Sequence, residues 1–76
     1  MNTEIRIPKL GASMEEGQLS EWLKKDREFI EKGAPLYLLE TDKLTQEIES
    51  PAAGKLNIIE PAGKMLPVGA LIALIA

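Results

Sequence analysis

The sequence contains neither cysteine nor histidine. Without cysteine the chain has no disulfide bond and no thiolate metal site, and without histidine it lacks the most common general base and metal ligand. Basic residues are also fewer than acidic ones, nine against twelve, and the two signs are interleaved along the chain for a net charge of −3. These deficits argue against an enzyme that works alone and against nucleic acid as a partner.

Aromatic residues and long apolar runs are scarce as well. Trp22, Phe29 and Tyr37 are the only aromatic residues, too few for a surface that stacks on bases. The apolar stretch at residues 68–76 is far shorter than the ~20 residues that a membrane helix needs, and residues 1–10 lack the apolar run of a secretory signal. We therefore expect one domain without a membrane partner, in a bacterial-type cytoplasm rather than in the mitochondrial matrix.

The two halves of the chain resemble each other. Residues 17–22 align with residues 54–59 at an offset of 37, which places glycine on glycine and apolar residue on apolar residue. An offset of 36 then aligns residues 30–38 with residues 66–74 in the same way. We interpret this pattern as two similar units joined by residues 40–53.

The repeat decides between helix and strand in the first half. Residues 13–30 contain a capping-box pattern and apolar residues at helical spacing, so a helix is the rival interpretation. The matching segment of the second half contains Pro61, Gly63 and Pro67, which would break a helix. Because equivalent segments should share one conformation, we predict strands in both halves.

The predicted fold is all-β. Apolar residues alternate in pairs such as Ile5/Ile7 and Leu36/Leu38, which places each pair on one face of a strand. Two antiparallel sheets packed face to face and related by a pseudo-twofold axis would let both halves line one core, as a flattened barrel or sandwich. The predicted strands cover residues 4–7, 18–24, 35–40, 44–49, 55–60 and 71–75, with short pairings around Ile30 and Leu66.

A polar segment, Glu40-Thr41-Asp42-Lys43-Leu44, lies between two of these strands, and we predict a hairpin with Lys43 at its tip. A lysine beside an aspartate in a turn is usually an ordinary solvated charge. An exposed tip also suits covalent attachment, because a modifying enzyme can reach the amine there. The residues alone leave both interpretations open.

The sequence resembles the lipoyl domains of dihydrolipoamide acyltransferases in four places, namely residues 11–17, residues 33–36, Glu-Thr-Asp-Lys at residues 40–43, and Gly54. The resemblance covers nearly the whole chain. It implies a flattened barrel of two four-stranded sheets, in which a lysine in a β-turn is joined by an amide to lipoic acid.

The resemblance also assigns roles to residues. It makes Lys43 the lipoylated lysine, and it gives recognition of the turn by partner enzymes to its neighbours Glu40, Thr41, Asp42 and Leu44. It expects Gly54 to help keep the lysine at the correct height. Residues 13–17 would lie near the same end of the molecule.

A carrier function follows from the resemblance. Residues 1–76 would form a single lipoyl domain, no enzyme by itself, at the N-terminus of a longer dihydrolipoyllysine-residue acyltransferase. A lipoate ligase or lipoyl transferase would attach lipoic acid. A thiamine-dependent 2-oxo acid dehydrogenase would load the acyl group, the acyltransferase core would pass it to coenzyme A, and dihydrolipoamide dehydrogenase would reoxidise the dithiol. Residues 13–17 favour a pyruvate or acetoin complex, and we expect the isolated domain to be a monomer.

Two other functions stay open, and the chain departs from the family at two points. Biotin carriers share the architecture, but methionines typically flank their lysine, whereas Asp42 and Leu44 flank Lys43. A non-covalent β-sandwich interaction module would use Lys43 as an ordinary surface residue.

The family usually has alanine at the position of Leu44 and commonly Gly-Asp at the position of Arg27-Glu28. We expect the fold to survive both changes and Leu44 to affect the choice of partner.

Overall fold

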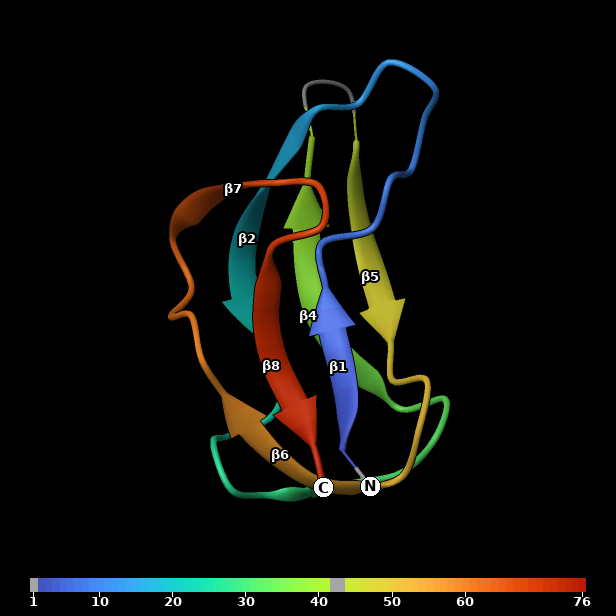
Figure 1. The fold of residues 1–76 in the computed structure, drawn as a ribbon, viewed down its shortest axis with the longest axis vertical. Coiled ribbons are helices and arrows are strands. Elements are labelled where there is room, and N and C mark those ends of the chain that lie inside the picture. The colour runs from blue at the N-terminus through green and yellow to red at the C-terminus, as the bar shows by residue number, and fades with distance from the viewer. Residues whose placement is uncertain (1, 42–43) are drawn as a thin grey trace.

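The computed structural model describes residues 2–41 and 44–76 (Figure 1). This part of the chain contains strands and loops and no helix, which confirms the choice of strands over a helix for residues 13–30. None of it forms a helix that is long and apolar enough to cross a membrane. The strands are β1 (Thr3–Arg6), β2 (Glu16–Trp22), β3 (Phe29–Ile30), β4 (Pro35–Glu40), β5 (Thr45–Glu49), β6 (Gly54–Ile58), β7 (Lys64–Pro67) and β8 (Leu71–Ile75).

The strands form two antiparallel sheets of four strands each, as predicted. One sheet has the order β1-β8-β6-β3 and the other has the order β5-β4-β2-β7. Alternate side chains of both sheets point inward, and burying them stabilises the fold because apolar surface leaves water. The buried apolar core consists of Ile5, Ile7, Leu19, Ile30, Leu36, Tyr37, Leu39, Leu56, Ile72, Ala73 and Ile75.

Backbone pairing confirms the internal repeat. Gly17 pairs with Leu66 between β2 and β7, and Gly54 pairs with Ile30 between β6 and β3. These are the residues that the offsets of 37 and 36 equate. The β2–β4 and β6–β8 pairs likewise share one register, since Leu19–Leu39 and Leu56–Ile75 are counterparts. The two halves are therefore related by the predicted pseudo-twofold axis.

The chain ends complete this symmetry. Strand β5 pairs with β4 as β1 pairs with β8, so β1 and β5 occupy equivalent edge positions. The connection between β4 and β5 is consequently the counterpart of the place where the chain begins and ends. Figure 1 shows the two termini at one end of the long axis, and the end of β4 and the start of β5 at the other.

One loop breaks the symmetry. Ile7 and Ser50 are counterparts, because each makes two backbone hydrogen bonds with a Gly-Ala pair that precedes a strand. The partner pair of Ile7 is Gly69-Ala70, before β8, and the partner pair of Ser50 is Gly33-Ala34, before β4. Nine residues separate Ile7 from Gly17, whereas three separate Ser50 from Gly54. The segment of residues 8–16, called the inserted loop below although Glu16 already belongs to β2, therefore has six more residues than its counterpart.

Several strand ends differ from the prediction, and one difference has a clear cause. The strand predicted over residues 55–60 ends at Ile58. The N–H groups of Ile59 and Glu60 both donate to the Ile72 carbonyl oxygen, at 2.9 and 3.1 Å. Two residues thus oppose one, which is the arrangement of a β-bulge, and regular pairing stops there.

Two aromatic residues brace one side of the core. The rings of Trp22 and Tyr37 are 5.4 Å apart between centroids and tilted by 58°. Trp22 Nε1 donates a hydrogen bond to the Glu60 carbonyl oxygen at 2.9 Å. Tyr37 is fully buried, and this desolvation raises the pKa of its phenol from 10.0 to about 12, since the charged form is disfavoured away from water.

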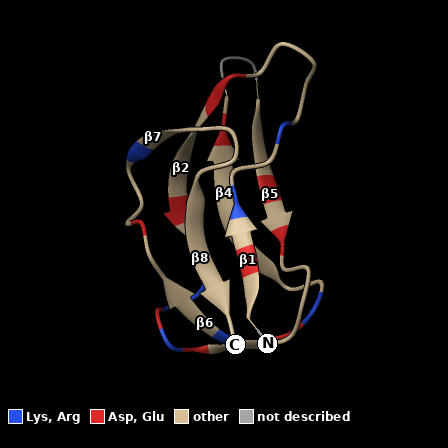
Figure 2. Cartoon of the chain, viewed as in Figure 1, with Lys and Arg blue, Asp and Glu red and all other residues tan. Residues whose placement is uncertain are grey.

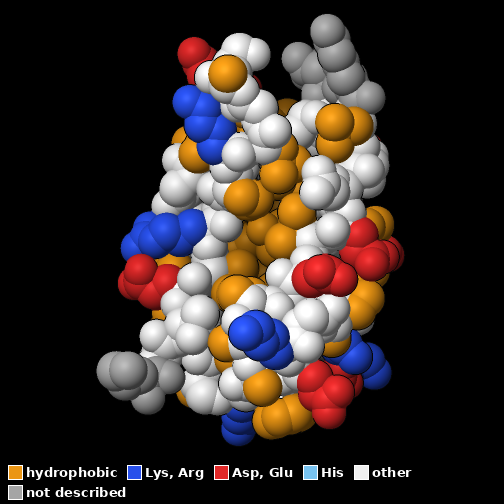
Figure 3. All heavy atoms as spheres, turned by 90° about the vertical axis from the view of Figure 1, so that its right-hand side faces the viewer, with side chains coloured by type: hydrophobic (Ala, Val, Ile, Leu, Met, Phe, Trp, Pro, Cys, Tyr) orange, Lys and Arg blue, Asp and Glu red, His pale blue; other side chains and the backbone are white. Residues whose placement is uncertain are grey.

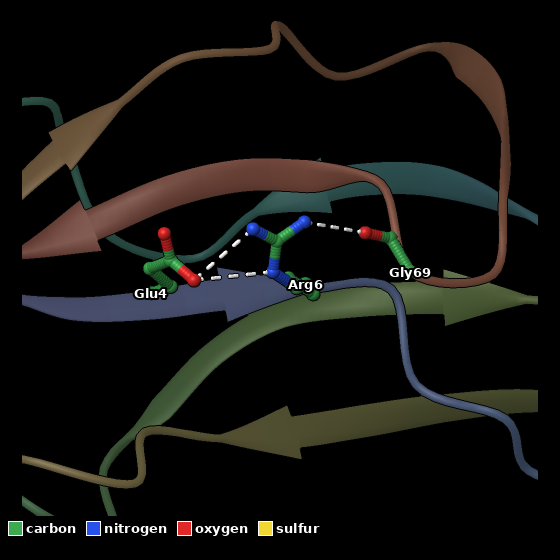
Figure 4. Close-up of polar contacts among 3 residues, drawn as sticks. All are labelled: Glu4, Arg6 and Gly69. Atoms are coloured by element: carbon green, nitrogen blue, oxygen red, sulfur yellow. Dashed lines mark hydrogen bonds and ion pairs between the residues drawn. The ribbon is translucent and has the colours of Figure 1, made fainter.

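None of the described charged residues is buried, and Figure 2 shows where acidic and basic residues fall along the ribbon. The Arg6 guanidinium pairs with the Glu4 carboxylate at 3.0 Å, and its Nη1 donates to the Gly69 carbonyl oxygen at 2.8 Å (Figure 4). The side chains of the ion pair are 48% and 55% exposed, so the pair contributes little stability. The contact with Gly69 fastens β1 to the turn that precedes β8.

Candidate attachment site

The candidate site is the connection between β4 and β5. The two strands pair as far as Glu40 and Thr45. Beyond this pair, the Thr41 N–H donates to the Leu44 carbonyl oxygen at 2.8 Å, and the Thr41 hydroxyl donates to the same oxygen at 3.3 Å. The two strands are thus joined as a closed hairpin, as predicted. The two residues between Thr41 and Leu44 are Asp42 and Lys43, which lie outside the described residues.

The side chains that frame the hairpin differ in chemistry. Glu40 is exposed, and its Oε2 accepts a hydrogen bond from Thr45 Oγ1 at 3.5 Å. Leu44 is 49% exposed and is not packed against the core. A carboxylate, a hydroxyl and an isobutyl group therefore lie at the base of the hairpin.

The inserted loop of residues 8–16 lies beside this hairpin. Gln18 in β2 pairs with Glu40 in β4, so the loop enters β2 at the level where the hairpin begins. This placement agrees with the expectation that residues 13–17 lie near the attachment end (Figure 1).

Met14 holds the loop in place. Its Sδ accepts a hydrogen bond from the Leu10 N–H at 3.2 Å. Its methyl group occupies the space above Gly17, because a Cβ added there would lie 2.9 Å from Met14 Cε and 2.9 Å from Leu39 Cδ1. Gly17 is therefore required for close packing of Met14 on the core. Sequence reasoning gave Met14 no packing role; the available signal was that Met14 and Leu10 are the two large apolar side chains of residues 9–16.

The loop and the hairpin enclose an open hollow. Its apolar lining comes from Leu10, Met14, Leu44 and Met65, and acidic residues border it. No lysine or arginine within residues 2–41 and 44–76 contributes to the lining. Figure 3, which faces the side of the molecule that carries β5, shows hydrophobic side chains gathered along the middle of this face.

Gly54 lies at the opposite end of the molecule from the hairpin. It begins β6, and a Cβ added to it would collide with the carbonyl oxygen of Ala76, next to the C-terminus. Its φ of 155° also lies in a region that other residues rarely adopt. This placement corrects the expectation that Gly54 belongs with the recognition residues: the structure gives it a packing role. The pseudo-twofold counterpart, Gly17, is the glycine that lies at the level of the hairpin.

Within residues 2–41 and 44–76, no group of three or more acidic residues is placed to bind a metal ion. Among the described residues, the side chains that line the hollow beside the hairpin carry carboxylates, hydroxyls, a carboxamide and apolar groups. This arrangement suits recognition and attachment.

Comparison with known proteins gives one family. The model of a family described as "Biotin-requiring enzyme" matches residues 3–75, almost the whole chain. Curated proteins also match, and in each case this chain corresponds to a small part of the other protein.

Three of these relatives illustrate the range. The dihydrolipoyllysine-residue succinyltransferase component of the 2-oxoglutarate dehydrogenase complex from Bartonella vinsonii subsp. berkhoffii is 48% identical, over 95% of this chain and 18% of that protein. The dihydrolipoyllysine-residue acetyltransferase component of the acetoin cleaving system from Pseudomonas putida is 40% identical, over 93% of this chain and 20% of that protein. The dihydrolipoyllysine-residue acetyltransferase component of the pyruvate dehydrogenase complex from Rhizobium meliloti is 40% identical, over 100% of this chain and 17% of that protein. The chain thus spans about a fifth of the length of these relatives.

Proposed function

Since this chain belongs to the biotin/lipoyl attachment family, we propose that it is a covalent lipoyl carrier with Lys43 as the attachment residue. The observation that carries the proposal is the position of Glu-Thr-Asp-Lys, residues 40–43, at the closed hairpin between β4 and β5. The relatives are named for a dihydrolipoyllysine residue, which supports lipoate rather than biotin as the attached group. The neighbours of Lys43, Asp42 and Leu44, support the same choice because they are not the methionines typical of biotin carriers.

The described residues fit a lipoyl group. The hairpin is open to solvent on the side of Leu44, and the adjacent hollow offers apolar side chains at a scale suited to an alkyl arm with a small ring. When bound, the group supplies the two sulfur atoms that carry acyl groups, and the chain has no cysteine of its own. The chain's own residues hold the attachment point: β4 and β5 pair up to its base, and the Thr41–Leu44 hydrogen bonds fix the spacing of the two strands.

The proposed partners follow from the proposed role. A lipoate ligase or lipoyl transferase would modify Lys43, a thiamine-dependent dehydrogenase would load the acyl group, an acyltransferase core would receive it, and dihydrolipoamide dehydrogenase would restore the disulfide. We propose that Glu40, Thr41, Asp42 and Leu44 form the surface these enzymes recognise. The parent protein would be a longer acyltransferase in a bacterial-type cytoplasm, with this chain as its N-terminal carrier domain.

Intact mass tests the modification. The purified chain is incubated with lipoate, ATP and a lipoate ligase, and separately with biotin, ATP and a biotin ligase. We expect one lipoyl group on the native chain, none on Lys43→Arg, and no biotin on either. A lipoyl group that persists on Lys43→Arg would contradict the choice of residue, and an unmodified native chain would contradict the carrier function in favour of a non-covalent interaction module.

The identity of the complex is the finer part of the proposal. Residues 13–17 support a pyruvate or acetoin complex, whereas relatives of similar identity serve 2-oxoglutarate, acetoin and pyruvate systems. Reductive acylation of the lipoylated chain by each of the three dehydrogenases, followed by mass spectrometry, separates them. Faster acylation by the 2-oxoglutarate enzyme than by the other two would overturn our assignment.

A further inference from the structure

We propose that the lipoyl arm, once attached, rests against an apolar shelf formed by Leu10, Met14 and Leu44 beside the hairpin. The proposal rests on the proposed function, because it needs the arm to be attached at Lys43. It concerns what this chain's own residues do with the arm between visits to partner enzymes.

The arm and the shelf are neighbours by covalent connection. Leu44 is bonded directly to Lys43, so the arm starts one residue away from it. Leu44 is also 49% exposed and takes no part in the core, which leaves its side chain without a packing role in the described structure.

The other part of the shelf is held rigidly. Leu10 and Met14 both pack against the core, and Met14 is fixed from two directions, by the hydrogen bond from the Leu10 N–H and by close contact above Gly17. All three shelf residues line the same hollow. A ring that enters the hollow meets an ordered apolar surface on the loop side and Leu44 on the hairpin side.

The acidic residues around the hollow disfavour an anionic occupant and leave a neutral one unaffected. Glu15, Glu16 and Glu40 border it, and their carboxylates would repel the carboxylate of free lipoic acid. Attachment turns that carboxylate into an amide and removes the positive charge of the lysine, so the arm is uncharged throughout. Tethering also supplies an effective concentration on the order of millimolar, so that even a weak apolar contact is populated.

Nuclear magnetic resonance of the lipoylated chain tests the contact directly. With methyl groups labelled, we expect cross-relaxation between the protons of the dithiolane ring and the methyl groups of Met14 and Leu44. Lipoylation should shift both methyl signals, whereas the methyl signals of Ile59, which is 46% exposed but does not line the hollow, should stay in place.

A second measurement uses the rate at which a water-soluble phosphine reduces the ring disulfide to two thiols while the phosphine is oxidised. Loss of apolar contact worth about one methylene group corresponds to about a fourfold change in population, so we expect reduction of lipoylated Leu44→Ala to be faster by up to about this factor. Ile59→Ala is the matched control and should react like the native chain. Intact mass confirms that every variant carries one lipoyl group, so a failure of attachment is recognised before either measurement. Equal reduction rates for the native chain and Leu44→Ala, together with no ring-to-methyl signal, would overturn the shelf.

Discussion

Replacing Arg27 by glycine should stabilise this protein. Arg27 is the one non-glycine residue with positive φ in the described structure, at 70°. Its N–H donates to the Leu56 carbonyl oxygen at 2.6 Å. The pseudo-twofold counterpart of this residue is Gly63, which has a φ of 94° and donates to the Leu19 carbonyl oxygen at 2.7 Å. The same turn is therefore built twice, once with glycine and once with arginine.

The size of the effect follows from two opposing terms. A left-handed backbone costs an L-residue roughly 1–2 kcal/mol, and glycine loses about 0.5–1 kcal/mol more conformational entropy than other residues when the chain folds. The Arg27 side chain is exposed, and its guanidinium has no hydrogen bond or ion pair within residues 2–41 and 44–76. We expect a net stabilisation of about 0.5–1 kcal/mol.

Urea unfolding followed by the fluorescence of the single tryptophan measures this change, because Trp22 is packed against Tyr37 in the folded state. With a urea slope of about 1 kcal/mol per molar for a small domain, the midpoint of Arg27→Gly should rise by about 0.5–1 M. Arg27→Ala removes the same side chain but keeps the strained backbone, so it should give no such rise. The reciprocal change Gly63→Ala should lower stability by about 1 kcal/mol. A midpoint for Arg27→Gly at or below the native value, with Gly63→Ala neutral, would refute the reasoning.

Three further predictions concern packing and pH. Gly17→Ala places a methyl group against Met14 and Leu39, and we expect a loss of about 1–3 kcal/mol in thermal unfolding, together with shifted amide signals in the loop of residues 8–16. Gly54→Ala should cost more, because its methyl group would meet the backbone of Ala76, which cannot move aside as the flexible Met14 side chain can; an equal or smaller loss would contradict this. Because burial raises the pKa of Tyr37 from 10.0 to about 12, the neutral phenol stabilises the folded state below pH 10.0, and this contribution is lost as the pH rises toward about 12. Its upper limit is about 3 kcal/mol. Ultraviolet absorbance of the phenolate should lag behind that of free tyrosine and then rise as the chain unfolds; full ionisation near pH 10 with the fold intact would show that Tyr37 is not buried in this way.

The repeat made most of the fold predictable. Matching glycines and apolar residues at offsets of 37 and 36 gave the strand conformation and, as the structure shows, the pairing of Gly17 with Leu66 and of Gly54 with Ile30. The positive φ of Arg27 was not predicted, because its counterpart Gly63 lies outside both aligned blocks of the repeat. The glycine that the resembled family commonly has at this position was the available signal, but its replacement was interpreted only as a departure that the fold would survive.

The hairpin of the site could be predicted from the sequence, but the position of Gly54 could not. The hairpin follows from a polar segment between two strands, but the place of Gly54 does not follow from its distance of eleven residues from Lys43. A strand rises about 3.3 Å per residue, so β5, with five residues, is long enough to carry the chain from one end of the molecule toward the other. The number of residues between two positions gives the length of chain that joins them but not their distance in the folded molecule. For this reason Gly54 was grouped with the residues of the hairpin, although it lies at the other end of the molecule.

The position of the chain ends has a mechanical consequence. Both termini lie at one end of a molecule 32 Å long, and the β4–β5 hairpin lies at the other (Figure 1). A tether joined to either terminus would act as a pivot, and the rigid sandwich would act as a lever that moves the hairpin along an arc with a radius close to its own length. The sandwich would thereby lengthen the reach of whatever group the hairpin carries, and the tether would stay at the end away from the hairpin.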